Sequence, residues 1–403
     1  MTFGHRMLAE WMLDPGILYL NHGTVGATPR RVLACQQAIR DRMERGPSQF
    51  LLREVARPFV PSSEPSSPSL MRRAAGEVAA RFGCRADDLV FVDNATTGVN
   101  AVLNSLDLAP GDEIVITDHA YGAVANAAAY FAQRRGARLV PVTVPYPRFD
   151  ADRLVEAVSA ALGPRTRLAI LDHVTSESAL VMPLAKLARA CRAQGVAVLA
   201  DGAHAPGAIP LDVPALGVDW YAANLHKWAW APRSCGFLWT QPERQPGTHP
   251  VVISWGLGEG YTTEFDWVGT RDPSPWLAAP EGLRYLEELG VEAVLAWNHA
   301  LAWGAGTALA AAWGTELGVT EADSGTMVTV PLPAGLGSTR EEAARLRNAL
   351  LYQNAIESQL HAWGGQLWVR ISAQVYNESG DFDRLAAAIL RHHRVYHKNR
   401  VTS

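Results

Sequence analysis

Cysteine and charge are both scarce in this chain of 403 residues. The four cysteines lie far apart, without the CxxC or CxxH spacing of a zinc site or the density of a disulfide framework. Lys and Arg number 36 against 40 Asp and Glu, and no basic block stands out. Neither nucleic acid nor an anionic membrane is therefore an expected partner, and no metal site is predicted.

A long apolar run is missing as well. Residues 1–20 carry charges throughout and lack the apolar core of a secretory signal, and no later stretch is long enough to cross a bilayer. These absences predict a cytoplasmic protein. What the chain does have is a hydrophobic fraction of 48% and a length that allows two domains around a large core.

Short apolar runs alternate with helical patterns between residues 89 and 239, and polar or small residues follow many of the runs. This alternation predicts an α/β fold with a mostly parallel sheet, in which ligands bind at the carboxyl ends of the strands. A separate stretch rich in Pro and Ser, 61–68, predicts a surface loop. The strand-like runs are 89–92, 113–116, 137–142, 167–171, 196–200, 220–223 and 235–239.

Lys227 follows one of these runs, in the stretch Asn224-Leu225-His226-Lys227-Trp228. A lysine at the end of a buried strand either reaches back to solvent or lies in a dry pocket, where its pKa falls and it can form a Schiff base. Asp201 ends another apolar run, and His204 lies three residues beyond it. A buried carboxylate together with a buried lysine suits pyridoxal 5'-phosphate, which needs a lysine at its aldehyde carbon and an anion at its ring nitrogen.

This pair resembles the aspartate and lysine of the class V aminotransferases, which are pyridoxal-phosphate enzymes of fold type I. The family includes cysteine desulfurases, isopenicillin N epimerases and hercynylcysteine sulfoxide lyases. The resemblance covers nearly the whole chain and implies a large domain, whose mostly parallel sheet is sandwiched by helices, plus a smaller C-terminal α+β domain. We expect the large domain at 17–270, and the small domain that closes over the active site at 1–16 and 271–403.

The resemblance also assigns roles around the cofactor. Lys227 would hold it, Asp201 would keep its ring nitrogen protonated, and His204 would reach the side of its phenolic oxygen. Tyr121 matches the position of a flat side chain that stacks on the cofactor ring, although core packing would also explain a tyrosine there. These four residues are the predicted catalytic set. Ser176 falls where the desulfurases carry an asparagine near the phenolic oxygen, and serine can donate the same hydrogen bond.

Residues 93–100 join a strand to a helix through small and hydroxyl-bearing residues. Free N–H groups at a helix N-terminus bind phosphate, although a threonine cap serves any helix. The resemblance places the cofactor phosphate at this turn. The residues implied to lie beside it are Ala95, Thr96, Thr97, Asn224 and His226.

Substrate contacts are predicted at two further places. Arg370 lies inside the apolar run 367–372, where its forked guanidinium suits a carboxylate, and the resemblance matches it to the arginine that holds the substrate carboxylate. An interdomain ion pair is the alternative. Asn21 and His22 belong to an N-terminal loop that covers the active site in the family, so they either touch substrate or form a plain turn.

Gly269 and Thr270 match a Gly-Thr pair that, in class V dimers, completes the phosphate site of the other subunit. The resemblance therefore implies a homodimer with the active site at the subunit interface. This expectation comes from the resemblance alone.

The expected reaction takes place at the α-carbon of an amino-acid-type substrate. The desulfurases need a nucleophilic cysteine just before the carboxylate arginine, and this chain has no cysteine after Cys235. The motifs at 21–23, 201–207 and 268–272 look closest to the isopenicillin N epimerase branch. A C–S lyase or an aminotransferase on the same scaffold remains an alternative. A non-catalytic binding protein is the third, which the intact set of Lys227, Asp201 and Arg370 disfavours.

Overall fold

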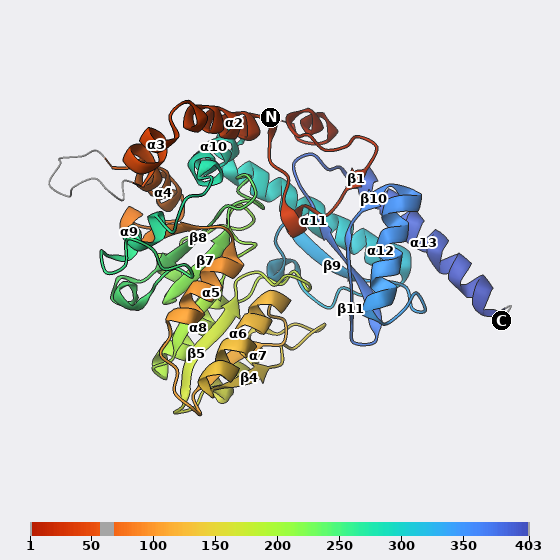
Figure 1. The fold of residues 1–403 in the computed structure, drawn as a ribbon. Helices are drawn as coiled ribbons and strands as arrows, with labels where there is room; N and C mark the ends of the chain where they lie inside the picture. The colour runs from red at the N-terminus through yellow and green to blue at the C-terminus, as the bar shows by residue number, and fades with distance from the viewer. Residues whose placement is uncertain (1, 57–67, 402–403) are drawn as a thin grey trace.

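The computed structural model describes residues 2–56 and 68–401, so the loop predicted at 61–68 lies, apart from Pro68, outside the described residues. Two bodies lie side by side in Figure 1: a larger one built on the yellow and green sheet, and a smaller one built from the blue C-terminal part. The N-terminal segment, in red, runs across the top of both. Among the described residues no helix has the length and apolar character that a membrane span requires.

The larger sheet has seven strands in the order β2-β8-β7-β6-β5-β3-β4 within the described part of the chain. Only β8 runs against its neighbours, and the pairs from β7 to β4 are all parallel. The predicted mostly parallel sheet is therefore present. The strands are β2 (Leu89–Val92), β3 (Glu113–Thr117), β4 (Arg138–Val142), β5 (Thr166–Asp172), β6 (Ala197–Asp201), β7 (Trp220–Asn224) and β8 (Gly236–Thr240).

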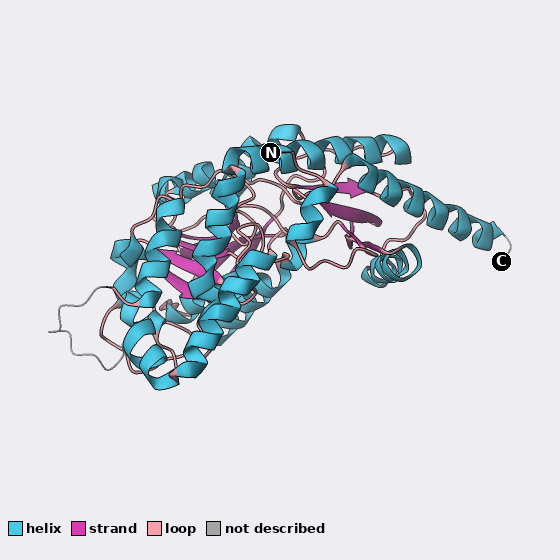
Figure 2. Ribbon diagram, turned by 90° about the horizontal axis from the view of Figure 1, so that it is seen from above, coloured by secondary structure: helices cyan, strands magenta, loops and turns pink. Residues whose placement is uncertain are grey.

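Helices enclose this sheet, as the view from above shows (Figure 2). The inner strands β6, β7 and β8 are buried along their whole length, because helices cover both faces. The edge strand β4 is partly exposed and accommodates Pro141, which a central strand would not tolerate. The helices are α4 (Leu70–Arg81), α5 (Ala95–Ser105), α6 (Gly122–Arg135), α7 (Ala151–Ala161), α8 (Leu184–Ala193), α9 (Tyr261–Asp266) and α10 (Ser274–Leu289).

The smaller body holds a three-stranded antiparallel sheet in the order β11-β12-β9. Helix α12 begins at a capping box in which Thr339 and Glu342 exchange hydrogen bonds with each other's backbone N–H. Its side chains pack on β11. The elements are α11 (Val291–Trp313), β9 (Met327–Pro331), α12 (Arg340–Asn354), β11 (Gln359–Trp363), β12 (Gln366–Ser372) and α13 (Ser379–Val401).

The N-terminal segment connects the two bodies. Strand β1 (Leu18–Tyr19) pairs in parallel with β10 (Ile356–Glu357), and Leu18 and Leu20 join the core of the smaller body. The short helix α1 (His22–Val25) and helix α2 (Arg30–Arg45) then lead to the larger body, where α10 packs against α2 and α4. The boundaries expected at 16/17 and 270/271 stay predictions.

The loop after α1 lies directly on the turn that carries Lys227. Gly26 has a left-handed φ of 69°, and a Cβ placed on it would lie 2.0 Å from the carbonyl oxygen of His226 and 2.9 Å from Cα of Lys227. Only glycine fits so close an approach without moving one of the two backbones. The N-terminal loop therefore fixes the position of the lysine turn.

Gly26→Ala is expected to destabilise the protein by roughly 2 kcal/mol, since it adds left-handed strain and overpacking at one place. The midpoint of chemical denaturation measures the effect. Gly304→Ala is the matched control: it lies within α11 with open space around it, so alanine should be neutral or stabilise by up to about 1 kcal/mol. Equal midpoints for the two variants would show that the loop does not press on the Lys227 turn.

Candidate active site

The carboxyl ends of β5, β6 and β7 meet the N-termini of α5 and α6 around a cavity of about 220 Å³. Most of the predicted cofactor residues line it, although they come from positions far apart in the chain. A second, outer cavity of about 670 Å³ adjoins it and shares Thr24, Tyr121, Ser176 and Lys227. The predicted residues that line the inner cavity are Ala95, Thr96, Tyr121, Ser176, Asp201, His204, Asn224, His226 and Lys227.

Lys227 is buried where the two cavities meet. Its Nζ lies 3.1 Å from Nε2 of His204. Burial, and after it the charge of Arg370, lower the pKa of Lys227 from its ordinary value of 10.5 to about 7 against the opposing effect of Asp201. Burial and Lys227 also hold the pKa of His204 well below its ordinary value. The amine is thus available in its neutral, nucleophilic form near neutral pH.

Asp201 ends β6 and is 4% exposed. One of its oxygens accepts the N–H of Ala203 at 2.9 Å. Burial raises the pKa of Asp201, while this hydrogen bond and Lys227 lower it. Asp172 is its register partner at the end of β5 and also lines the inner cavity. Burial and the charge of Asp201 raise the pKa of Asp172 well above its ordinary value, so the pair favours one negative charge over two.

The opposite end of the inner cavity is formed by the N-terminus of α5. Asn94 caps the helix by accepting the N–H of Thr97 at 2.9 Å, and the N–H of Ala95 donates to Oδ1 of Asn224 at 2.8 Å. Thr96 faces the cavity, whereas Thr97 is not part of its lining. Burial lowers the pKa of His226 to about 4, so its ring is neutral and the anion-binding character of this end comes from the helix N-terminus.

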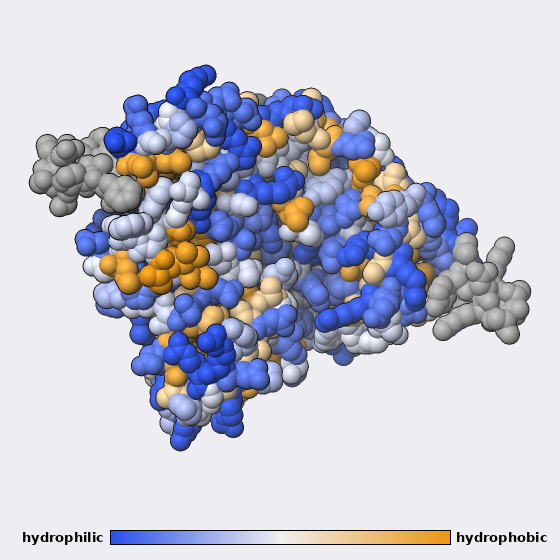
Figure 3. Space-filling model, in the orientation of Figure 1, coloured by the Kyte–Doolittle hydropathy of each residue, from blue (hydrophilic) through white to orange (hydrophobic). Residues whose placement is uncertain are grey.

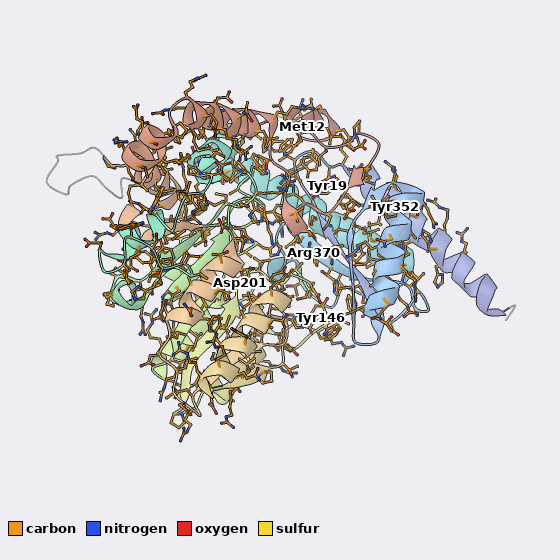
Figure 4. The ribbon with its side chains drawn as sticks, viewed as in Figure 1. Met12, Tyr19, Tyr146, Asp201, Tyr352 and Arg370 are labelled. Atoms are coloured by element: carbon orange, nitrogen blue, oxygen red, sulfur yellow. The ribbon has the colours of Figure 1, made fainter. Side chains whose placement is uncertain are left out.

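Arg370 reaches the outer cavity from β12 and is 2% exposed. Its guanidinium donates to the carbonyl oxygen of Ser176 at 2.6 Å and to Oγ1 of Thr24 at 2.7 Å. Its Nε has no hydrogen-bond partner among the described residues. A buried guanidinium N–H without a partner is costly, and this side of the fork is available to an acceptor from a ligand. Figure 4 shows Arg370 near the middle of the molecule, with Asp201 on the side of the larger sheet.

Asn21 and His22 line neither cavity. His22 is fully buried: its Nδ1 lies 2.8 Å from the Tyr376 hydroxyl and its Nε2 lies 3.0 Å from the carbonyl oxygen of Lys227. Oδ1 of Asn21 accepts hydrogen bonds from Arg370 and Thr24. Both side chains are thus engaged within the protein, and the expected substrate contacts of Asn21 and His22 stay predictions.

Two other predicted positions differ in their surroundings. Tyr121 precedes α6, lines both cavities and is 46% exposed, so it is not a core tyrosine. Gly269 and Thr270 do not line the cavities of their own chain. The next residue, Arg271, lies 4.0 Å from the ring centre of Trp276 and 3.6 Å from a carboxylate oxygen of Asp93.

A family model settles the relationship to known proteins. The model for aminotransferase class-V matches residues 62–385 of this chain. The chain belongs to the class V aminotransferases. Isopenicillin N epimerase from Streptomyces clavuligerus is 34% identical over 95% of this chain and 98% of its own length. A probable chloroplastic L-cysteine desulfhydrase from Arabidopsis thaliana is 33% identical over 93% of this chain and 83% of its own.

Solved structures share the fold. The cystine C-S lyase C-DES in complex with cysteine persulfide superposes with a TM-score of 0.77 at 23% identity, covering 96% of this chain and 98% of that one. Cysteine desulfurase CsdA from Escherichia coli superposes with a TM-score of 0.75 at 19% sequence identity, covering 97% of this chain and 98% of that one. The predicted family, fold type and class of enzyme, one that depends on pyridoxal phosphate, are confirmed.

Three features of this class V site were missed in the sequence. Asp172 ends its strand as Asp201 does, which was a usable signal. Thr24 belongs to a loop where no pattern tells which side chain faces inward. The outer cavity also takes one face of α12 and an aromatic group that includes Tyr146 and Trp363, which no motif indicates.

The lowered pKa of Lys227 predicts how the chain reacts with pyridoxal phosphate. Because only the neutral amine attacks an aldehyde, the rate of cofactor uptake by cofactor-free protein should rise through a midpoint near pH 7 and level off above it. Arg370→Met removes a cation that lowers this pKa, so the midpoint should move to higher pH. Stopped-flow absorbance measures both rates. A wild-type midpoint near 10 would contradict the buried, neutral lysine.

Proposed function

We propose that this enzyme labilises the α-carbon of an amino-acid substrate that carries a free α-carboxylate. One observation supports this above all: Lys227 and Arg370 face a shared space, the amine with a pKa near neutrality and the guanidinium with an unpartnered N–H. The first can hold a cofactor and move a proton. The second can fix a carboxylate at a set orientation relative to it.

The inner cavity fits pyridoxal phosphate by the chemistry of its lining. Lys227 would hold the aldehyde carbon, Asp201 the ring nitrogen and the N-terminus of α5 the phosphate, with Thr96 beside it. Nδ1 of His204 is buried without a partner among the described residues and is free to meet a ligand atom. When bound, this cofactor withdraws electrons from the substrate α-carbon.

The residues of the chain then divide the work. Lys227 accepts the α-proton and returns it, because its pKa lies near the working pH. Asp201 stabilises positive charge at the ring nitrogen. The neighbouring Asp172 keeps the total charge of the two carboxylates near one negative charge. Tyr121 stands at the entrance between the two cavities, where its ring can cover the cofactor.

Epimerisation, with isopenicillin N epimerase as the resembling relative, is the first candidate reaction. Elimination of a sulfur-bearing side chain is the second, favoured by the similar identity to L-cysteine desulfhydrases, and transamination is the third. A persulfide-forming desulfurase is disfavoured, since no cysteine is among the described residues that line either cavity. Burial raises the pKa of the thiols of Cys84, Cys191 and Cys235.

A homodimer in the cytoplasm is also part of the proposal. The loop 251–257 presents apolar side chains to solvent, and Figure 3 shows an orange patch over this part of the larger body. Exposed apolar patches of this kind mark protein contacts. A dimer would cover them and would let Gly269 and Thr270 serve the site of the partner. The exposed side chains are Val251, Val252, Ile253, Trp255 and Leu257.

Incubating the holoenzyme with a panel of amino acids in D₂O tests the function. Deuterium at the α-carbon with inversion indicates epimerisation, an oxo acid indicates transamination, and pyruvate with ammonia indicates elimination. Lys227→Ala should abolish all three and leave no borohydride-reducible cofactor attachment. Undiminished exchange in that variant would show that another base acts.

Arg370→Lys keeps the charge but loses the fork. We expect KM for the active amino acid to rise about tenfold or more, because a bidentate charge-assisted contact is lost, with a smaller fall in kcat. Cofactor absorbance should hardly change. Arg189→Lys on the outer surface of α8 is the control and should leave KM, kcat and cofactor absorbance unchanged. Release of cofactor with KM intact would place Arg370 in the cofactor site instead.

A further inference from the structure

One face of α12 lines the outer cavity. Arg340, Ala343, Ala344 and Arg347 all belong to its wall, and their spacing of three, four and seven places them on one side of the helix. The two arginines are separated by about 10 Å along the helix axis at 1.5 Å per residue. Of the two alanines between them, Ala343 is buried against the core of the smaller body and Ala344 is half-buried. The face therefore carries a cation at each end and small apolar side chains between them.

Arg340 is exposed and Arg347 is half-buried, so both guanidinium groups can meet a ligand in the outer cavity. Neither forms an ion pair or a hydrogen bond with any residue that the structure describes. Arg345, outside the cavity lining, is the arginine of α12 that pairs with Glu342. Arg340 is moreover the first residue of the helix, where the helix dipole opposes positive charge. Their presence at the cavity wall points to an anionic ligand.

The charges around the cavity support the same conclusion. Its lining contains two carboxylates, Asp118 and Glu177, and three arginines. Asp118 accepts the N–H of Val144 at 2.9 Å, and Glu177 acts on Arg370, whose pKa it raises against the effect of burial. Neither carboxylate forms a salt bridge with Arg340 or Arg347 among the described residues, and the arginines of the lining outnumber the carboxylates. Burial lowers the pKa values of His119 and His361, so these rings add no compensating charge of either sign.

An aromatic wall completes the cavity. The ring centres of Tyr146 and Trp363 lie 4.9 Å apart, and His119 lies 5.1 Å from Tyr146, both in edge-to-face geometry. Figure 4 shows Tyr146 between the two bodies, close in view to Arg370. The rings offer apolar surface to a stem, and the Tyr146 hydroxyl and Nε2 of His119 are buried polar atoms without a partner among the described residues. The cavity thus offers an arginine at its inner end, apolar surface along its side and two arginines on α12.

We propose that Arg340 and Arg347 bind a second anionic group at the far end of the substrate, so that the enzyme selects amino acids whose side arm ends in a carboxylate. The inference rests on the proposed function, in which Arg370 takes the α-carboxylate. It adds the class of substrate: an α-amino acid with an apolar stem and a distal acid. A small neutral amino acid would leave both arginines and most of a 670 Å³ cavity unused.

Binding of unreactive acids tests the site without turnover. Calorimetry on the holoenzyme compares glutarate, adipate and pimelate with hexanoate, which has one carboxylate. The best dicarboxylate should bind about tenfold more tightly than hexanoate, as one charge-assisted contact provides. Arg340→Ala/Arg347→Ala should abolish that difference. Arg345→Ala, on the same helix but outside the cavity lining, should preserve it. Equal affinities in the wild type, or an unchanged difference in the double variant, would overturn the proposal.

Turnover gives a second, separable readout. Exchange of the α-proton in D₂O is compared for L-glutamate, L-2-aminoadipate and L-2-aminopimelate against L-norleucine. The double variant should raise KM for the best diacid about tenfold while KM for norleucine and kcat hold steady. If no amino acid exchanges but the calorimetric difference is present, the α-carbon function fails and the anion site stands. If norleucine is preferred in both wild type and double variant, the anion site fails and the α-carbon function stands.

Discussion

Keeping one amine out of water is the constraint on which the rest of the site depends. Lys227 is useful only if it is neutral near pH 7, and that requires burial together with a nearby cation. The same burial is unfavourable for a charged ammonium, so the folded state is more stable with Lys227 in its neutral form. The carboxylate of Asp201 raises the pKa of Lys227 and so opposes these two effects. Its partner Asp172 then limits how much negative charge the strand ends can carry.

In the proposed function, the inner cavity carries the chemistry and the outer cavity selects the substrate. The inner one is built at the end of the larger sheet, while much of the outer one comes from α12, β11 and β12 of the smaller body. Substitutions in the smaller body can therefore change what enters without disturbing Asp201 or the N-terminus of α5. Relatives with the names of an epimerase and a desulfhydrase match this chain at 34% and 33% identity over most of its length.

The sequence was informative where geometry is imposed by the sheet. Parallel strands deliver their carboxyl ends to one edge, so Asp201, Ser176 and Lys227 had to lie together once the strands were recognised. The sequence was uninformative where a side chain could point either into the cavity or away from it. His22 could equally face the cavity or the backbone of Lys227, and only the packing decides. Arg347 gave no signal either, since a helical arginine is ordinarily a solvated one.

His22 brings three distant parts of the chain to one ring. It is fixed by the Tyr376 hydroxyl on one side and by the backbone of residue 227 on the other, at separations of 354 and 205 residues. A chain that ends at β8 contains His22 and Lys227 but lacks the Tyr376 hydroxyl that meets the other side of the ring. The site is completed only when the last part of the chain has folded back on the first. Without the residues after β8, Nδ1 of His22 therefore loses the hydroxyl that it meets in the full chain.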